Sequence, residues 1–265
     1  MAVRIDTPQQ FQRQFGAIAI LDALGASYYS EQEIIQFLSS RDRVLADLNE
    51  WIEEEHGVVR IDPNDLEIFT FNDTIIIVLK SGMARITLDK SISFTALLRK
   101  FLVDSMAEGI LFRGSAALGA FYVDSKTNTV MGEAVTDAAQ WYEKSDWVGV
   151  HFTPRSFIEL TRMVEVDDRS PRWAFTRWGV PLRDGGELDT YAVNWPKIFL
   201  LKARPWPDDL PPRSKLLKFL GRHRVPQGTE GKYFNTIKFF DSSIAMEMQT
   251  QKKTQKKARP RKSGK

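Results

Sequence analysis

The sequence predicts an α+β fold in which an antiparallel sheet is covered on one face by two helices. Short apolar runs within residues 17–21, 66–79 and 110–121 have the length of strands. Two longer segments, at about residues 30–57 and 94–108, repeat apolar residues at helical spacing. The order is therefore strand, helix, hairpin, helix, strand, which is the split βαββαβ, or ferredoxin-like, palm.

The first helix has clear start and stop signals. Ser30 and Glu33 form a capping box at its beginning, and His56 with Gly57 ends it. Its apolar residues recur every three or four positions, so we expect one face to pack on the sheet. The residues of that face are Ile34, Ile35, Leu38, Leu45, Leu48 and Ile52.

The rest of the chain extends this core. Gly132 opens a third short helix, and residues 147–152 have the pattern of a strand. Further on we expect a helix to Met163, a strand at 188–193, and helices at 214–220 and about 230–248. No long linker interrupts the pattern. We therefore predict one domain over residues 1–250, with a core at 15–153 and a C-terminal α/β extension at 154–250.

The composition of the chain excludes several classes of protein and of site. The chain has no cysteine, which excludes disulfides, thiolate metal sites and cysteine nucleophiles. It shows neither a signal peptide nor an apolar stretch of roughly 18 residues, so we expect a cytoplasmic protein. Residues 252–265 carry eight basic residues and no acidic one. We expect a disordered basic tail at 251–265, and nucleic-acid contact only through it.

Two aspartates follow apolar runs. Asp22 ends the first run, and Asp73 lies at the turn of the hairpin. Carboxylates delivered by strand ends suit two divalent ions that hold a triphosphate for in-line displacement. An acidic residue at a strand end is also an ordinary solvated turn residue, so that alternative stays open. The small residues that let backbone amides approach an anion are Ala23, Leu24, Gly25, Ala26 and Ser27.

Four segments resemble, in order and spacing, the signature stretches of class III nucleotide cyclases. They are AIAILDALGAS, IFTFNDTIIIV, LFRGSAALGAF and GEAVTDAAQWYE, within residues 17–150. The resemblance implies that Asp22 and Asp73 bind two Mn²⁺ or Mg²⁺ ions and that backbone groups of residues 23–27 bind the triphosphate. It implies a catalytic role for Arg113, which begins the fourth core strand. It also implies a homodimer in which one subunit supplies the metals and the other the base contacts.

The base-reading positions depart from this family. Phe69 replaces the purine-reading lysine, and Thr129 replaces the base-reading aspartate. Thr136 and Gln140 replace the asparagine and the arginine of the closing helix. We expect Phe69, Thr129 and Thr136 to remain in the substrate site, where an aromatic ring can stack on a smaller base.

The loss of that arginine leaves the charge of the transition state without its usual donor. Arg113, Lys232 and Lys238 are the alternatives for this role. The sequence does not choose among them.

This profile resembles the pyrimidine cyclases of bacterial anti-phage signalling. It implies a uridylate or cytidylate cyclase that converts UTP or CTP to the 3′,5′-cyclic monophosphate and pyrophosphate, and whose product a separate effector senses. The sequence does not choose between UTP and CTP. Three alternatives stay open: a purine nucleotide cyclase, an enzyme like diguanylate cyclases or oligonucleotide-forming polymerases, and a nucleotide- or nucleic-acid-binding module without catalysis.

Overall fold

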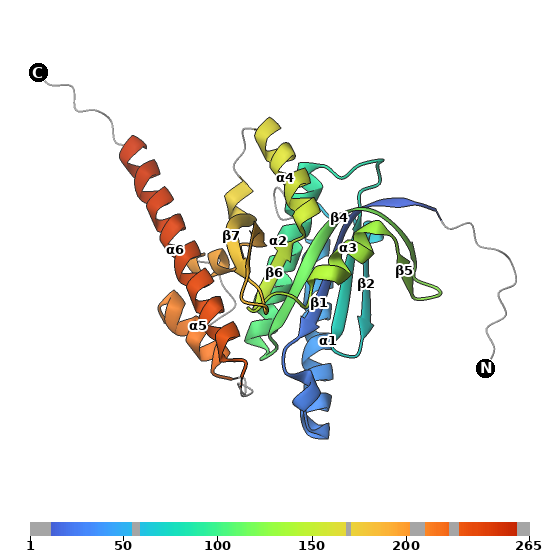
Figure 1. Cartoon of the computed structure of the whole chain (residues 1–265), viewed down its shortest axis with the longest axis horizontal. Coiled ribbons are helices and arrows are strands. Elements are labelled where there is room, and N and C mark those ends of the chain that lie inside the picture. Colours follow the sequence, from blue (N-terminus) through green and yellow to red (C-terminus); the bar gives the residue numbers. More distant parts are fainter. Residues whose placement is uncertain (1–11, 55–58, 168–170, 202–209, 223–227, 259–265) are drawn as a thin grey trace, which may run out of the picture.

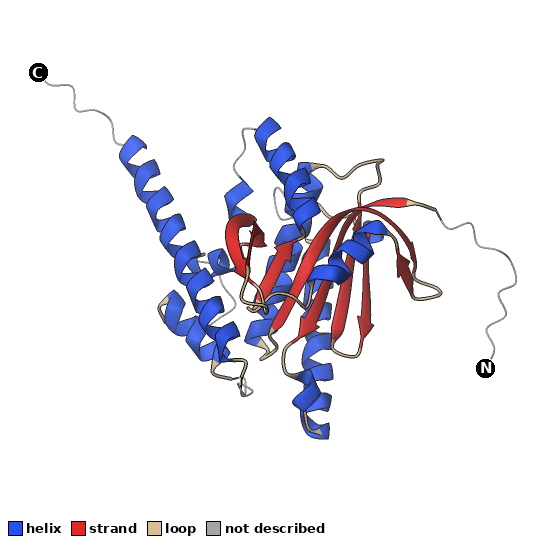
Figure 2. Ribbon diagram, viewed as in Figure 1, coloured by secondary structure: helices blue, strands red, loops and turns tan. Residues whose placement is uncertain are grey.

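A computed structural model describes residues 12–54, 59–167, 171–201, 210–222 and 228–258, with side chains up to residue 250. The chain forms an eight-stranded mixed sheet with helices on both faces (Figures 1 and 2). The first four strands lie in the order β2, β3, β1, β4, which is the order of the ferredoxin-like topology. The expected α+β class is confirmed.

The core elements follow one another as the sequence predicts. The capping box at Ser30 and Glu33 is present, and Asn72 takes the left-handed conformation, with φ 52°, in the turn between β2 and β3. The elements are β1 (Gln14–Ala23), the 3₁₀ helix η1 (Ala26–Tyr28), α1 (Glu31–Glu53), η2 (Pro63–Asp65), β2 (Leu66–Phe71), β3 (Thr74–Lys80), α2 (Leu88–Ala107), β4 (Phe112–Asp124), β5 (Thr129–Met131) and α3 (Glu133–Trp141).

The part of the chain after α3 adds three strands to the same sheet, of which β7 and β8 lie in the extension. The elements of this part are β6 (Gly149–Phe152), α4 (Pro154–Val166), η3 (Pro171–Trp173), β7 (Phe175–Pro181), β8 (Glu187–Val193), η4 (Trp195–Leu200), α5 (Pro212–Leu220) and α6 (Glu230–Ala258). β6 pairs with β4 in parallel, and β8 and β7 follow it. Helix α6 continues past residue 250, into the stretch expected to begin the tail, while residues 259–265 lie outside the described part. Within the described residues, no helix combines the length and apolarity needed to span a membrane.

Side chains of β1 alternate between the two faces of the sheet. Ala19 and Leu21 belong to a large buried cluster with α1 and α2, which also includes Trp195 and Phe239 of the extension. Ile18 belongs to a smaller cluster beneath α3 on the opposite face. The extension therefore shares its hydrophobic core with the palm.

The prediction of which α1 residues pack on the sheet is wrong for the first half of the helix. Ile34, Ile35 and Leu38 are 45%, 59% and 38% exposed, whereas Leu48 and Ile52 are buried as expected. The first turns of α1 extend beyond the edge of the sheet (Figure 1), so these side chains have no strand to pack against.

One further boundary differs from the sequence prediction. Helix α2 begins at Leu88 rather than near Phe94, because the Thr87 side chain accepts a hydrogen bond from the Lys90 amide and caps the helix. Strand β4 covers most of the predicted run at 110–121 and is continuous through Arg113 and Gly114.

The close approach of β1 and β4 depends on Gly114. A Cβ atom at this residue would lie 2.2 Å from the carbonyl oxygen of Ile20. We predict that Gly114→Ala lowers the free energy of unfolding by about 1–3 kcal/mol or more, because the backbone of β1 must shift. Urea denaturation measures this. Gly186→Ala, in an exposed turn, is the control, and an equal loss in both variants would contradict the argument.

Candidate active site

The two predicted metal ligands lie close together where β1 ends and β3 begins. Asp22 pairs across the sheet with Thr74 of β3 and Arg113 of β4, and Asp73 lies in the turn that precedes Thr74. The amide of Ala23 donates a 3.0 Å hydrogen bond to the carbonyl oxygen of Asp73, which ties the turn to the end of β1. The fold therefore brings together two carboxylates that are far apart in sequence.

The small-residue loop after Asp22 turns tightly into α1. Gly25 has φ 83°, a left-handed conformation that favours glycine. The amides of Ala23 and Leu24 are used by Asp73 and Leu111. Within the described residues, the amides of Gly25, Ala26 and Ser27 have no hydrogen-bond partner. Only these three of the five residues predicted to bind the triphosphate therefore offer free donors.

Arg113 forms a buried ion pair with Asp22. Its Nε and Nη2 atoms donate hydrogen bonds of 3.0 and 2.7 Å to Asp22 Oδ2, and Nη1 donates to the carbonyl of Glu143 at 3.4 Å. Arg113 is only 5% exposed. The structure thus places the predicted catalytic arginine on the first aspartate, which holds and orients that carboxylate.

Burial is the largest influence on the pKa of the Asp22 carboxyl. It raises the pKa of the carboxyl above its ordinary value of 3.8, and the Arg113 guanidinium opposes this only in part. The charges of Asp73 and Glu143 raise the pKa further. A bound cation would have the opposite effect, so this carboxylate is predisposed to bind one.

These residues line one pocket of about 280 Å³. Its opening carries cations as well as carboxylates, and several of its residues come from the C-terminal extension. The lining residues are Asp22, Ala23, Leu24, Gly25, Ala26, Ser27, Tyr28, Asp73, Arg113, Arg183, Thr229, Lys232 and Tyr233.

The donor set fits a hard cation only in part. Within the described residues, no group of three or more His, Cys, Asp or Glu side chains could hold a metal ion. Asp22 and Asp73 supply carboxylate oxygens, which Mg²⁺ and Mn²⁺ prefer. Ions that bind here would need further oxygen ligands, which a phosphate-bearing substrate and water provide.

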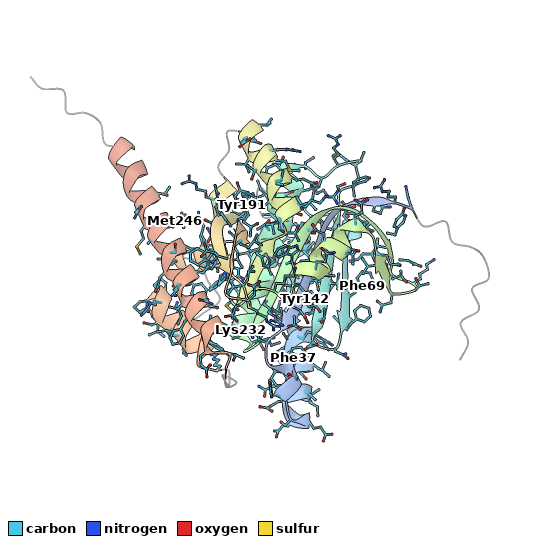
Figure 3. The ribbon with its side chains drawn as sticks, in the orientation of Figure 1. Phe37, Phe69, Tyr142, Tyr191, Lys232 and Met246 are labelled. Carbon is cyan, nitrogen blue, oxygen red and sulfur yellow. The ribbon has the colours of Figure 1, made fainter. Side chains whose placement is uncertain are left out.

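The predicted base-site residues are not in this pocket. Phe69 of β2 is 4% exposed and packs in the cluster beneath α3 (Figure 3). Thr129 lies on β5, where its hydroxyl bonds to Thr127, and Thr136 is exposed on α3. The structure therefore gathers the residues predicted to bind metal and phosphate but not those predicted to bind the base.

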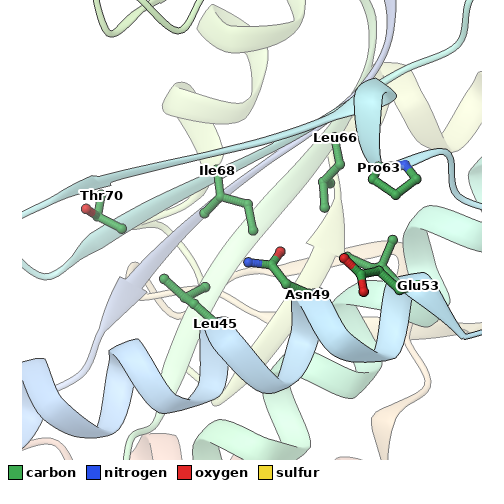
Figure 4. Close-up of a pocket in the computed structure, with 8 residues that line it drawn as sticks. Leu45, Asn49, Glu53, Pro63, Leu66, Ile68 and Thr70 are labelled. Atoms are coloured by element: carbon green, nitrogen blue, oxygen red, sulfur yellow. The ribbon is translucent and has the colours of Figure 1, made fainter.

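A second cavity of about 500 Å³ lies between α1 and the edge strand β2 (Figure 4). It is larger, but its lining contains one carboxylate, Glu53, and no cation. This donor set suits neither a phosphate nor a two-metal site.

Sequence reasoning missed part of the pocket. Arg183 follows the end of β7, and Thr229 and Tyr233 lie around the start of α6, and none of the four signature segments reaches either place. Lys232, one of three candidate donors, does line the pocket, whereas Lys238 is exposed two turns further along α6.

Comparisons with known proteins find similar structures but no similar sequence. No protein-family model and no curated protein matches the chain. The adenylyl cyclase CyaB from P. aeruginosa shares 10% identity at a TM-score of 0.41, over 74% of this chain and 98% of that one. The catalytic core of a rhodopsin-guanylyl cyclase with converted specificity, in complex with ATPαS, shares 11% identity at a TM-score of 0.41, over 70% and 98%.

Replacement of Arg113 should show how much the ion pair with Asp22 contributes to the free energy of unfolding. We predict that Arg113→Met lowers the free energy of unfolding by about 3–5 kcal/mol at neutral pH, because Asp22 stays buried without a partner. The folded-state pKa of Asp22 is already raised and rises further in the variant. The loss should therefore shrink as the pH falls toward about 4 and the carboxyl takes up a proton.

Urea denaturation at several pH values measures the effect. The control is Arg177→Met, which removes an exposed pair with Asp189 and should leave the free energy of unfolding almost unchanged. A pH-independent loss in Arg113→Met would contradict the role assigned to Asp22.

Proposed function

We propose that the chain is a nucleotide cyclase, which converts a nucleoside triphosphate to the 3′,5′-cyclic monophosphate and pyrophosphate by two-metal phosphoryl transfer. The observation that carries the proposal is the convergence of two carboxylates and three free loop amides in one pocket. The carboxylates suit divalent ions, and the amides suit phosphate oxygens.

Asp22 and Asp73 would hold the ions. Arg113 occupies Oδ2 of Asp22, and no hydrogen bond among the described residues uses Oδ1, so one carboxylate oxygen remains for a cation. Bound Mg²⁺ or Mn²⁺ supplies Lewis-acid stabilisation of the phosphate charge and makes the ribose 3′-hydroxyl more acidic. The amides of Gly25, Ala26 and Ser27 orient the phosphates.

The reaction is a single in-line displacement. The ribose 3′-oxygen forms a bond to the α-phosphorus, while the bond from that phosphorus to the oxygen of the β-phosphate breaks. Pyrophosphate leaves with the bonding electron pair, and the hydroxyl proton passes to water. The chain's residues contribute position and charge rather than a covalent intermediate.

We propose a pyrimidine substrate, UTP or CTP. Phe69 and Thr129 stand where the resembled family carries the charged residues that read a purine, and neither offers a charge. The resemblance to anti-phage pyrimidine cyclases is also the basis for proposing a second messenger that a separate effector senses in defence. A purine substrate is the alternative.

We also propose that the active form is a homodimer. A pocket of about 280 Å³ suits a metal-bound triphosphate but is small for a whole nucleotide. Thr129 and Thr136 lie outside it, so a second copy would have to present them to the base, whereas Phe69 is buried in the cluster beneath α3 and is not available to it.

Turnover tests the proposal directly. Purified protein is incubated with each of the four ribonucleoside triphosphates and Mn²⁺ or Mg²⁺, and products are identified by mass. We expect a cyclic pyrimidine monophosphate from the wild type.

Asp73→Asn should lose at least about 100-fold in rate, since a metal ligand is gone while no buried ion pair is broken. Asp42→Asn, on the exposed side of α1, should keep full activity. Turnover that survives Asp73→Asn would overturn the two-metal proposal.

Mixing variants tests the shared site. Asp73→Asn disables the metal half, and Thr136→Trp blocks the expected ribose side of the other half. Each variant alone should be inactive. A mixture should recover about a quarter of wild-type activity, because half of randomly formed dimers contain one intact site. Mixtures that stay inactive, while both variants remain folded dimers, would contradict sites shared between subunits.

A further inference from the structure

Two cations from the C-terminal extension line the same pocket as Asp22 and Asp73. They are Arg183 and Lys232. Within the described residues, neither side chain forms a hydrogen bond or salt bridge, whereas Arg113 is fully engaged by Asp22. The pocket therefore contains two positive charges that are not neutralised by direct contact.

The surroundings make these charges costly without an anion. Lys232 is half-buried, and burial lowers its pKa below the ordinary 10.5, with Arg113 and the exposed Arg183 lowering it further while Asp146 and Asp22 oppose the shift in part. Like charges that crowd into a partly desolvated pocket repel one another. A polyanion in the pocket would remove that repulsion.

One short segment holds the backbone on which both cations are carried. The carbonyl of Lys144 accepts a 2.8 Å hydrogen bond from the Arg183 amide, and the Asp146 amide donates to the carbonyl of Pro181 at 2.8 Å. Asn235 of α6 donates to the Asp146 carbonyl at 2.8 Å. Residues 144–146 thus hold the turn that carries Arg183 and the helix that carries Lys232.

The first turns of α6 are packed tightly against this segment. A Cβ atom on Gly231 would lie 3.1 Å from Asp146 Oδ2, so glycine permits the close approach. The Thr236 hydroxyl accepts a 2.8 Å bond from the Val148 amide, and Phe239 packs edge-on against Trp147 at 4.6 Å. Lys232 therefore projects from a well-anchored turn rather than from a loose helix end.

We propose that Arg183 and Lys232 bind the two terminal phosphates of the nucleoside triphosphate, the part that leaves as pyrophosphate. This assignment rests on the proposed cyclase function for its substrate. When the bond between the α-phosphorus and the bridging oxygen breaks, negative charge gathers on the departing pyrophosphate, and adjacent cations stabilise it. Of the three cations considered from the sequence, Lys232 thus takes this role, while Arg113 holds Asp22 and Lys238 lies outside the pocket.

Binding of inorganic tripolyphosphate tests the assignment apart from catalysis. Isothermal titration calorimetry is carried out on the full chain with Mg²⁺ at low and at moderate salt. Lys232→Ala and Arg183→Ala should each weaken binding about tenfold or more, since each removes a charge-assisted contact. The matched controls are Lys238→Ala on the same helix and Arg177→Ala on the same hairpin, and both should bind like the wild type. Lys232→Arg should retain most of the affinity.

The outcomes separate this inference from the cyclase proposal. Tripolyphosphate binding that depends on Lys232 and Arg183, in a protein that cyclises no nucleotide, would support the phosphate site and reject the cyclase. Cyclisation together with unchanged tripolyphosphate binding in both variants would overturn the phosphate site. Far-ultraviolet circular dichroism and thermal unfolding check that each variant is folded; loss of binding counts only in variants that melt like the wild type.

Discussion

The buried pair of Asp22 and Arg113 is the constraint around which the site is built. The two residues face each other on β1 and β4, so the pair joins neighbouring inner strands. Removing two charges from water is expensive, and the interior repays it only when the geometry is good and the remaining atoms are bonded. The first condition holds for Arg113, which binds Asp22 with two nitrogens and the Glu143 carbonyl with a third, whereas Oδ1 of Asp22 has no hydrogen bond among the described residues and burial still raises the pKa of that carboxyl. The carboxylate of Asp22, a predicted metal ligand, is thereby part of the framework of the sheet.

The two carboxylates and the two cations without a salt bridge come from different parts of the chain. The palm supplies the two carboxylates and the glycine turn, while the extension supplies two cations that have no salt bridge among the described residues. The parts are held together by a shared hydrophobic cluster in which Trp195 and Phe239 join the side chains of α1, α2 and β1. The extension is therefore integral to the pocket, and a boundary drawn near residue 153 would divide the site.

Local signals explain what the sequence could predict. The order of strands and helices follows from apolar periodicity and the capping box, and Asp22 and Asp73 stand out because each adjoins an apolar run. The exposure of Ile34 was not predictable, since periodicity does not say where the sheet ends. Nor does it reveal that strand alternation turns Phe69 under α3. Arg183 escaped notice because it lies in a turn, and only tertiary packing brings that turn to the pocket.

Helix α6 runs from the pocket to a remote surface. Its first turn carries Lys232, and its 29 residues correspond to about 44 Å of length. Figure 1 shows that the far end extends away from the sheet, well past the packed first turns. Beyond the contact between Phe239 and Trp147, the buried Phe240 and the salt bridge of Glu247 to Lys197 hold the helix as far as residue 247. A sideways load on the far end would therefore fall on these contacts, and the turn that carries Lys232 would keep its position.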